Sequence, residues 1–411
     1  MPPQSLTAQF LSLFQNEFFL KILRTLWDTA YIWLPIVLIV TFGELWLRYI
    51  RLRQRINTPH TLLEIRFPLD IKRSPLAMET ILNVMYHTGE PGTWWDNLIE
   101  GRYRPEFSLE LASLEGEVHF YMRCRSKFKT QLESQIYSQY PNVEVVEVED
   151  YAAKIQYDEH TMKLFGLEQK LEKLDAYPIK TYVDFGLDRE QEEEYQVDPM
   201  NSIVEFMGSL GKGEYCFLQI IVRSHVPEKK VSGEKGLQDW QYGARKEVDR
   251  LLRRDPKTHV PLHQGDTFSD EEKRIADAII RNIGKKPFDT GIRVIYFGPN
   301  EYYNKDRHSS LPTMFRSFQS HTLNNLKPVF RTQFDWWYQN PFGWRAAERK
   351  REIYSAYRWR SWFHPPYKRP KFVMSSEEIA TIYHFPTSAV GAPGLRRITS
   401  RRGDAPANLP R

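Results

Sequence analysis

Residues 61–69, TLLEIRFPL, alternate apolar side chains with Glu64, Arg66 and Pro68. A period of two is typical of a strand that buries one face, so this stretch predicts the first strand of a sheet. Ser74-Pro75 follows within a few residues and predicts a helix start, with serine as the N-cap and proline at the first helical position. The chain therefore passes from strand to helix here, as the start of an α/β unit requires.

The rest of residues 61–150 continues this alternation. Glu115-Gly116 predicts a hairpin turn between two strands, and Pro141 ends the second helix. The order is that of the split βαβ, or ferredoxin-like, unit (βαββαβ), in which two helices cover one face of an antiparallel sheet. The predicted elements are a strand at 61–69, a helix at 74–88, strands at 107–113 and 117–124, a helix at 126–140 and a strand at 143–148.

A second, looser unit of the same kind is predicted over residues 175–335. Asp198-Pro199 repeats the capped helix start, and a charged insertion at 228–266 interrupts the pattern. The predicted fold class is therefore α+β, with tandem ferredoxin-like units of which the second carries the insertion. Its predicted elements are strands at 179–187, 214–223 and 291–297, and helices from 198, at 269–284 and near 312–323.

An apolar run at Ala30–Leu47 precedes these units. At about 1.5 Å per residue, residues 26–47 cross a hydrocarbon core of about 30 Å, so 26–55 is predicted to be a transmembrane helix with a basic flank. Glu44 can reach toward the interface, and Pro35 is tolerated in a spanning helix. The alternatives are a cleaved signal peptide, for which a basic start and a small-residue cleavage site are missing, and an ordinary buried helix.

The bases around this run are distributed unevenly. Lys21 and Arg24 are the two that precede it, whereas four arginines follow it. Because Lys and Arg are enriched on the cytoplasmic side of a span, we expect an N-out, C-in topology in the inner (cytoplasmic) membrane, with most of the chain in the cytoplasm. Residues 1–25 are amphipathic and predict either a segment along the membrane surface or an extension of the span. The membrane-flank arginines are Arg48, Arg51, Arg53 and Arg55.

The composition suits one anchor and a soluble body. Of the 411 residues 27% are charged, and the length leaves room for two domains of ordinary size. Cys124 and Cys216 lie in unrelated predicted strands without a Cys or His at metal-ligand spacing. We therefore expect a reducing compartment, buried thiols, no bound metal and no cofactor.

Motifs that could carry catalysis are weak. Residues 208–213, GSLGKG, lack the spacing and the final Ser or Thr of a Walker loop. Acidic residues cluster at 144–150 and 188–194, where paired carboxylates could do acid/base work or bind a metal, but their positions favour solvated faces. The sequence therefore predicts a protein that is not an enzyme.

A basic aromatic segment at 341–371 gives a stronger signal, and it lies within a predicted helical segment at 341–386. Nine bases stand there against Glu348 and Glu352, and the segment also contains the aromatic residues Trp344, Tyr354, Tyr357, Trp359, Trp362, Phe363 and Tyr367. This combination suits single-stranded nucleic acid, anionic lipid headgroups, or a helix that packs its rings on the body. The candidate contact residues are Arg345, Arg349, Lys350, Arg351, Arg358, Trp359, Arg360, Lys368 and Arg369.

The run FVMSSEEIATIYHFP at 372–386, with APANLP at 405–410, resembles the stretch that precedes the motor domain in conjugation and type IV secretion ATPases of the coupling and HerA-like kind. LLEIRFP, GEVHFYMR and neighbouring segments also resemble an uncharacterised membrane-anchored family of candidate-phylum bacteria. The chain stops at Arg411, where a Walker loop would be approaching, so no ATPase residue carries over. The resemblance implies docking of a partner through Glu378, Ile379, Tyr383, His384, Phe385 and Pro386.

These observations lead us to expect a membrane-anchored, non-enzymatic accessory subunit of a conjugation or type IV secretion-like DNA transfer apparatus. It would dock a separate hexameric cytoplasmic ATPase, and its other expected partners are the membrane and either DNA or anionic lipid, with self-association left open. The alternative is a scaffold for cell-envelope or pilus assembly that is unrelated to DNA. Residues 387–411 form a predicted flexible tail, because they are too poor in apolar side chains to fold alone.

Overall fold

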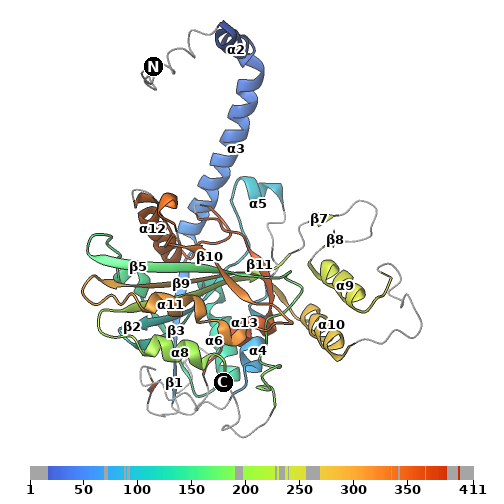
Figure 1. Ribbon diagram of the computed structural model, residues 1–411, viewed down its shortest axis with the longest axis vertical. Helices are drawn as coiled ribbons and strands as arrows, with labels where there is room; N and C mark the ends of the chain where they lie inside the picture. Colours follow the sequence, from blue (N-terminus) through green and yellow to red (C-terminus); the bar gives the residue numbers. More distant parts are fainter. Residues whose placement is uncertain are drawn as a thin grey trace, which may run out of the picture. The chain divides into compact units, whose positions relative to one another are not determined.

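The computed structural model describes residues 17–68, 73–87, 89, 93–189, 198–226, 229–230, 237–238, 240–255, 269–334, 336–340, 343–365, 367–386 and 397–398 (Figure 1). The chain divides into two compact units. The first contains residues up to 57 together with 93–102, and the second contains the rest. Residues 1–16 of the predicted amphipathic segment, and all of the predicted tail except 397–398, lie outside the described residues.

The first unit is helical. It contains α2 (Glu17–Asp28), α3 (Ala30–Asn57) and the short α5 (Trp94–Leu98). Helix α3 is long and apolar enough to cross a membrane, and its apolar window is not buried against other parts of the chain. The indole nitrogen of Trp46 donates a hydrogen bond of 2.6 Å to the carbonyl oxygen of Leu98, which ties α5 to α3.

The second unit is built on one large mixed sheet (Figure 1). The strands lie in the order β10-β5-β9-β6-β2-β3-β1, with β4 on the far side of β1 and β11 beside β9. Neighbouring strands are antiparallel except for β12, which is parallel to the end of β1. The strands are β1 (His60–Pro68), β2 (Phe107–Leu114), β3 (Glu117–Arg125), β4 (Glu144–Val148), β5 (Met162–Leu171), β6 (Tyr215–Ser224), β9 (Pro287–Pro299), β10 (Leu326–Arg331), β11 (Phe372–Ser375) and β12 (Arg397–Ile398).

The sheet consists of two halves with the same strand order. The first half runs β4-β1-β3-β2, and the second runs β10-β5-β9-β6. They join where β2 pairs with β6, so that Leu111 lies opposite Leu218. The antiparallel strands predicted for 61–150 are therefore present, and they continue into the second half without a break.

Helices cover both faces of this sheet. On one face Ile65, Leu111 and Val294 pack in a common core with side chains of α4, α6, α8, α11 and α13. On the other face Phe217 and Ile295 pack against α12. The helices of this unit are α4 (Leu76–Val84), α6 (Lys129–Gln139), α7 (Tyr151–Lys154), α8 (Asn201–Gly208), α9 (Trp240–Leu251), α10 (Asp270–Ile283), α11 (Arg307–Thr313), α12 (Trp344–Arg358) and α13 (Ser376–Ile382).

Smaller elements complete the unit. A two-stranded hairpin, β7 (Lys229–Lys230) and β8 (Leu237–Gln238), precedes α9 in the insertion predicted at 228–266. Helix α9 packs on α10 through Ala244, Val248 and Ile279. Short 3-10 helices lie at Ser126–Phe128, Arg316–Phe318 and Trp337–Gln339.

Two of the sequence predictions for the second half are wrong. Residues 179–187 form turns rather than a strand, because the backbone N–H groups of Ile179 and Tyr182 bind Glu378 and Thr381 instead of a neighbouring strand. The missing strand is β5, which ends at Leu171. The helix predicted near 312–323 is α11 (Arg307–Thr313), which begins and ends earlier.

The segment 341–386 is also not one helical segment. Helix α12 ends at Arg358, and the described residues between it and β11 are not helical. Strand β11 then pairs with residues 287–290 of β9, beside the stretch of β9 that pairs with β5. Helix α13 follows β11 directly, so this part of the chain belongs to the sheet and its core.

Gly291 provides a test of the packing on the α12 face. In β9 this glycine faces the indole ring of Trp362, and a Cβ atom at this position would overlap the ring. We expect Gly291→Ala to lower the free energy of unfolding by about 1–3 kcal/mol, because the ring must leave its packed position. Urea denaturation of the full chain in detergent, followed by tryptophan fluorescence, measures this change.

Gly243→Ala is the matched control. This glycine lies inside α9, and a Cβ atom there has no neighbour within 4 Å. Alanine should leave stability unchanged or raise it by up to about 1 kcal/mol through its higher helix propensity. Equal effects of the two substitutions would contradict the described position of Trp362.

Candidate functional site

The six predicted docking residues lie inside the second unit. Glu378, Ile379, Tyr383 and Phe385 have no exposed surface, His384 is 1% exposed, and Pro386 is also buried. Helix α13 begins at a capping box, in which the Ser375 hydroxyl accepts from the Glu378 N–H and the Glu378 carboxylate accepts from the Ser375 N–H. These side chains, which were predicted to dock a partner, therefore belong to the interior of the second unit and not to its surface.

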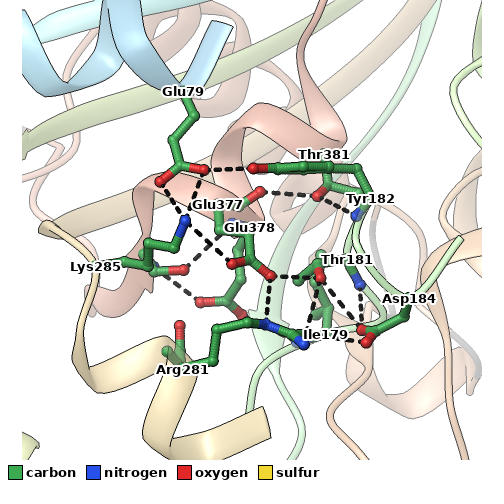
Figure 2. Close-up of polar contacts among 12 residues, drawn as sticks. Glu79, Ile179, Thr181, Tyr182, Asp184, Arg281, Lys285, Glu377, Glu378 and Thr381 are labelled. Atoms are coloured by element: carbon green, nitrogen blue, oxygen red, sulfur yellow. Dashed lines mark hydrogen bonds and ion pairs between the residues drawn. The ribbon is translucent and has the colours of Figure 1, made fainter. Parts of the chain in front are cut away.

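A compact group of charges holds α13 in place (Figure 2). Lys285, two residues after the end of α10, places its Nζ 2.9 Å from Glu79 of α4 and 3.5 Å from Glu377 of α13. Arg281 of α10 lies 3.0 Å from Glu377 and 2.9 Å from Asp184. Three carboxylates from three parts of the chain thus share two cations.

Glu378 lies beside this group, but none of the described lysines or arginines forms an ion pair with it. Its two carboxylate oxygens accept hydrogen bonds from the N–H groups of Ile179 (3.0 Å) and Ser375 (2.8 Å). Burial nevertheless raises the pKa of Glu378 to about 8, and the neighbouring charge of Glu377 acts in the same direction. At neutral pH this carboxyl group is therefore mostly protonated.

His384 lies two residues after the C-terminal end of α13 and fixes that end of the helix. Its Nε2 lies 3.0 Å from Asp198, and its Nδ1 lies 2.9 Å from the carbonyl oxygen of Ala380. Burial acts to lower the pKa of His384, but the charge of Asp198 raises it overall. The polar side chains of α13, together with His384, thus fix this part of the chain to α4, to the C-terminal end of α10, to residues 179–184 and to Asp198.

The basic aromatic segment divides into a buried and an exposed part. Arg360 is 2% exposed, and its Nε lies 2.9 Å from Glu110 in β2. It also pairs with Asp150, which lies just before α7. Although burial alone would raise it, the pKa of Glu110 falls to about 2 because of Arg360. Arg369 binds Glu168 at 3.0 Å and is half-buried.

Glu110 is the first of a row of four polar side chains that lie opposite one another on the neighbouring strands β2, β6, β9 and β5. Gln219 of β6 donates to Glu110 (3.1 Å) and accepts from Arg293 of β9 (3.2 Å). Arg293 in turn binds Glu168 of β5 at 2.9 Å. Each of these four side chains is at most 2% exposed. Arg360 therefore completes a buried network, and the half-buried Arg369 joins the same network through Glu168.

The remaining bases of this segment lie at the surface. Arg345, Arg351, Arg358 and Lys368 are exposed, as is Trp359, whereas Arg349 and Lys350 are half-buried. In α3, the flank residues Arg48 and Arg53 are exposed, and Arg51 and Arg55 are half-buried.

Two adjacent hollows lie beside the start of α12. The first, which we call the arginine hollow, has a volume of about 570 Å³ and is lined by Pro328, Val329, Arg331, Gln333, Phe334, Gln339, Arg345 and Arg349. The second, the lysine hollow, has a volume of about 500 Å³ and is lined by Lys163, Leu164, Phe165, Tyr303, Lys305, Thr332, Gln333, Phe334, Trp336, Asn340, Ala346 and Lys350. They share Gln333 and Phe334 as a common wall.

Three of the six lysines and arginines that line the two hollows were not predicted from the sequence. Arg331, Lys163 and Lys305 lie outside the segment 341–371, in β10, β5 and the loop after β9. The aromatic run at 336–338, directly before that segment, is the sequence feature that could have indicated a binding surface larger than 341–371. The structure thus brings Arg345, Arg349 and Lys350 together with three bases from distant parts of the sequence.

A larger cavity of about 1170 Å³ opens where β5 ends beside α9 and β11. Its walls include Tyr177, Trp240, Ile275 and Trp362, and Asp175 lies among them. Asp175 accepts a hydrogen bond from the N–H of Val373, and burial raises the pKa of its carboxyl group. These walls are mainly apolar, and this Asp is already used to hold β11.

The two cysteines and the acidic clusters were predicted to have no catalytic or metal-binding role. Within the described ranges, no group of three His, Cys, Asp or Glu side chains is arranged to hold a metal ion. Cys124 and Cys216 are buried free thiols, and burial raises the pKa of Cys124 to about 12. Glu144 and Glu147 are exposed, and most of the acidic cluster at 188–194 lies outside the described residues.

Comparison with known families gives one result. Residues 51–395 match the model of a family described as Domain of unknown function (DUF8128). Because the match covers most of the chain, the chain belongs to this family. A search of curated proteins finds no match.

The buried position of Arg360 can be tested by substitution. We expect Arg360→Met to lower the free energy of unfolding by about 3–5 kcal/mol, because Glu110 would stay buried without its cation. Arg358→Met, two residues earlier and exposed, should change it by less than about 0.5 kcal/mol. Urea denaturation of both variants measures the difference, and equal small effects would contradict the buried network.

The raised pKa of Glu378 predicts a pH dependence of stability. The folded protein keeps this proton up to about pH 8, whereas the unfolded chain releases it near 4.5. The folded state therefore binds more protons between these values, so its stability falls as pH rises through this window. This proton contributes a fall of up to about 1.4 kcal/mol per pH unit in the free energy of unfolding of the wild type, and Glu378→Gln should remove that part of the pH dependence. Denaturation of both proteins at pH 5, 6.5 and 8 measures the difference. Parallel pH profiles for wild type and variant would show that Glu378 has an ordinary pKa.

Proposed function

We propose that this DUF8128 family member is a membrane-anchored, non-enzymatic accessory subunit of a conjugation or type IV secretion-like DNA transfer apparatus, and that it docks a separate cytoplasmic ATPase. The observation that carries the proposal is the apolar helix α3, which ends at Asn57, so that only residues 58 and 59 separate it from β1. When α3 spans a membrane, so short a link keeps the start of β1 near that membrane. The resemblance of residues 372–386 to the region before a motor domain supports the ATPase partner.

The bases beside α3 support the orientation. Four arginines follow its apolar part, against Lys21 and Arg24 before it. By the positive-inside rule, this asymmetry favours a cytoplasmic body in the inner membrane. A reporter that is active only in the cytoplasm should then be active when it is fused after Arg411.

The use of buried carboxylates supports a structural rather than a catalytic role. Glu79, Glu110, Glu168 and Glu377 each bind an arginine or lysine that comes from another element. These carboxylates stabilise the fold through their charges, and their oxygens are directed at cations of the chain itself. ATP hydrolysis by the purified chain would overturn the non-enzymatic assignment.

The repeated strand order supports an origin by duplication. Each half contains a strand, a helix, two strands, a helix and a strand, and their spatial orders match. We infer that both halves are ferredoxin-like units, with β7, β8, α9 and α10 inserted between the second and third strands of the second unit. Two such units joined edge to edge form a broad platform on which other subunits can assemble.

The burial of α13 changes where the ATPase would dock. Its side chains hold the body together, so we assign docking to the chain beyond Pro386. A chain that ends at Pro386 should keep α13, remain folded and stay in the membrane fraction, but lose co-purification with a conjugation or secretion-type ATPase of the same genome. Retained capture of the ATPase would place the docking surface on the body instead.

A control separates loss of docking from loss of structure. A chain that ends at Met374 lacks α13 and the charges of Glu377, so it should unfold or aggregate in addition to losing the ATPase. Equal thermal stability of the two truncated chains would contradict the role of α13 in the core. The alternative function, an envelope or pilus scaffold unrelated to DNA, predicts no binding of DNA by either chain.

A further inference from the structure

The arginine and lysine hollows lie on one continuous surface. Gln333 and Phe334 line both, and α12 contributes Arg345 and Arg349 to the first and Lys350 to the second. The six bases that line them come from β5, β10, α12 and the loop that follows β9. A folded surface thus collects positive charge that is scattered through the sequence.

This charge is not compensated within the hollows. Arg345 and Arg349 donate to the backbone carbonyl oxygens of Gln339 (3.1 Å) and Arg331 (3.0 Å). No Asp or Glu lines either hollow in the described part of the chain. Residues 331–350 contain four bases and two acids, Glu348, which is exposed, and Asp335, which lies outside the described residues. The buried arginines of the body, in contrast, each bind a carboxylate.

Large aromatic rings project beside these bases. The exposed fractions of Trp336, Tyr338 and Trp344 are 59%, 60% and 52%. The rings of Trp336 and Tyr338 are stacked, with centroids 6.2 Å apart and an angle of 22° between their planes. Side-chain amides of Gln333, Gln339 and Asn340 line the hollows next to them. Rings of this size are usually buried, so their clustering here marks a binding surface.

These features together identify the chemistry of a ligand. Hollows lined with several lysines and arginines suit the phosphate groups of a nucleic acid. Exposed flat aromatic rings suit stacking on the faces of unpaired nucleobases. Amide side chains can also donate to and accept from base edges, which a lipid headgroup does not require. We propose that this surface binds single-stranded nucleic acid, with phosphates in the two hollows and bases stacked on Trp336 and Tyr338.

This inference rests on the proposed function, because it gives the DNA of the transfer apparatus a place on the body. It also narrows the candidate residues. Arg345, Arg349 and Lys350 belong to the surface, whereas Arg360 and Arg369 belong to the buried network. Arg331, Lys163 and Lys305 are added to it.

The experiment uses the full chain in nanodiscs of neutral lipid and a fluorescent oligothymidine of about 20 nucleotides, long enough to cover one such site. Anisotropy gives the affinity at several salt concentrations. For single strands each neutralised phosphate contributes about 0.7 to the slope of log K against log salt. The double variant Arg345→Gln, Arg349→Gln should therefore bind at least about ten-fold more weakly and lower that slope by about 1.4.

A second variant tests stacking separately from charge. Trp336→Ala should weaken binding about five-fold or more while leaving the salt slope unchanged, because it removes a ring and no charge. The matched control is Arg351→Gln, Arg358→Gln, which removes two bases from the same helix outside both hollows. It should change affinity less than two-fold, and near-ultraviolet circular dichroism should confirm that all variants are folded.

The outcomes are distinct. Oligonucleotide binding that is absent, or unaffected by the hollow variants, overturns the inference. If the same arginines instead control attachment to vesicles that contain phosphatidylglycerol, the surface recognises lipid and the inference is also overturned. Capture of the ATPase by the unsubstituted chain is measured in parallel. If that chain captures the ATPase but does not bind the oligonucleotide, only this surface is contradicted, and if it binds the oligonucleotide but does not capture the ATPase, only the docking proposal is contradicted.

Discussion

Arg360 reaches Glu110 across the α12 face of the sheet, and burying these two charges is possible only if both are paired. An uncompensated charge in a protein interior costs several kcal/mol, so every element that touches this pair must hold its position. Asp150 fixes the start of α7, and the row through Gln219, Arg293 and Glu168 links β2, β6, β9 and β5. The opposite face follows the same rule, since Arg281 of α10 and Lys285, just after α10, bind carboxylates of α4 and α13. Paired desolvated charge thus sets the relative positions of the helices on both faces.

The sequence was most informative where turn and capping residues bound each apolar segment. Strands β1, β2, β3 and β4 alternate or contain compact apolar runs, and hairpin and capping residues mark their ends. Strand β5 was missed because its apolar pattern is broken by the polar residues Glu168 and Gln169, which are nevertheless only 2% and 1% exposed. Residues 179–187 have high strand propensity, but their backbone donors bind α13, a contact nearly 200 residues away in sequence. Propensity is local, whereas the partner that overrides it is not.

The candidate site shows the same limit. A run of arginines and aromatic rings predicted a binding segment, and part of it does lie at the surface. Arg360 looks like its neighbour Arg358 in the sequence, yet it pairs with Glu110, 250 residues earlier. Conversely, Lys163 and Lys305 have no local feature that distinguishes them from other surface lysines. They join α12 only because β5 and the end of β9 lie next to each other in the folded sheet.

The place of α13 also determines when the body can fold during synthesis. Strand β11 and helix α13 are made after almost all of the sheet, yet β11 completes an edge of β9 and α13 fills the core beside α4. Until residue 386 has left the ribosome, Met78, Ile81 and the carboxylate of Glu79 have no partners from this helix. The nascent sheet must therefore remain incomplete, with an apolar surface open, for most of translation. Closure of the body is a late event, and the chain is exposed to chaperones and proteases until then.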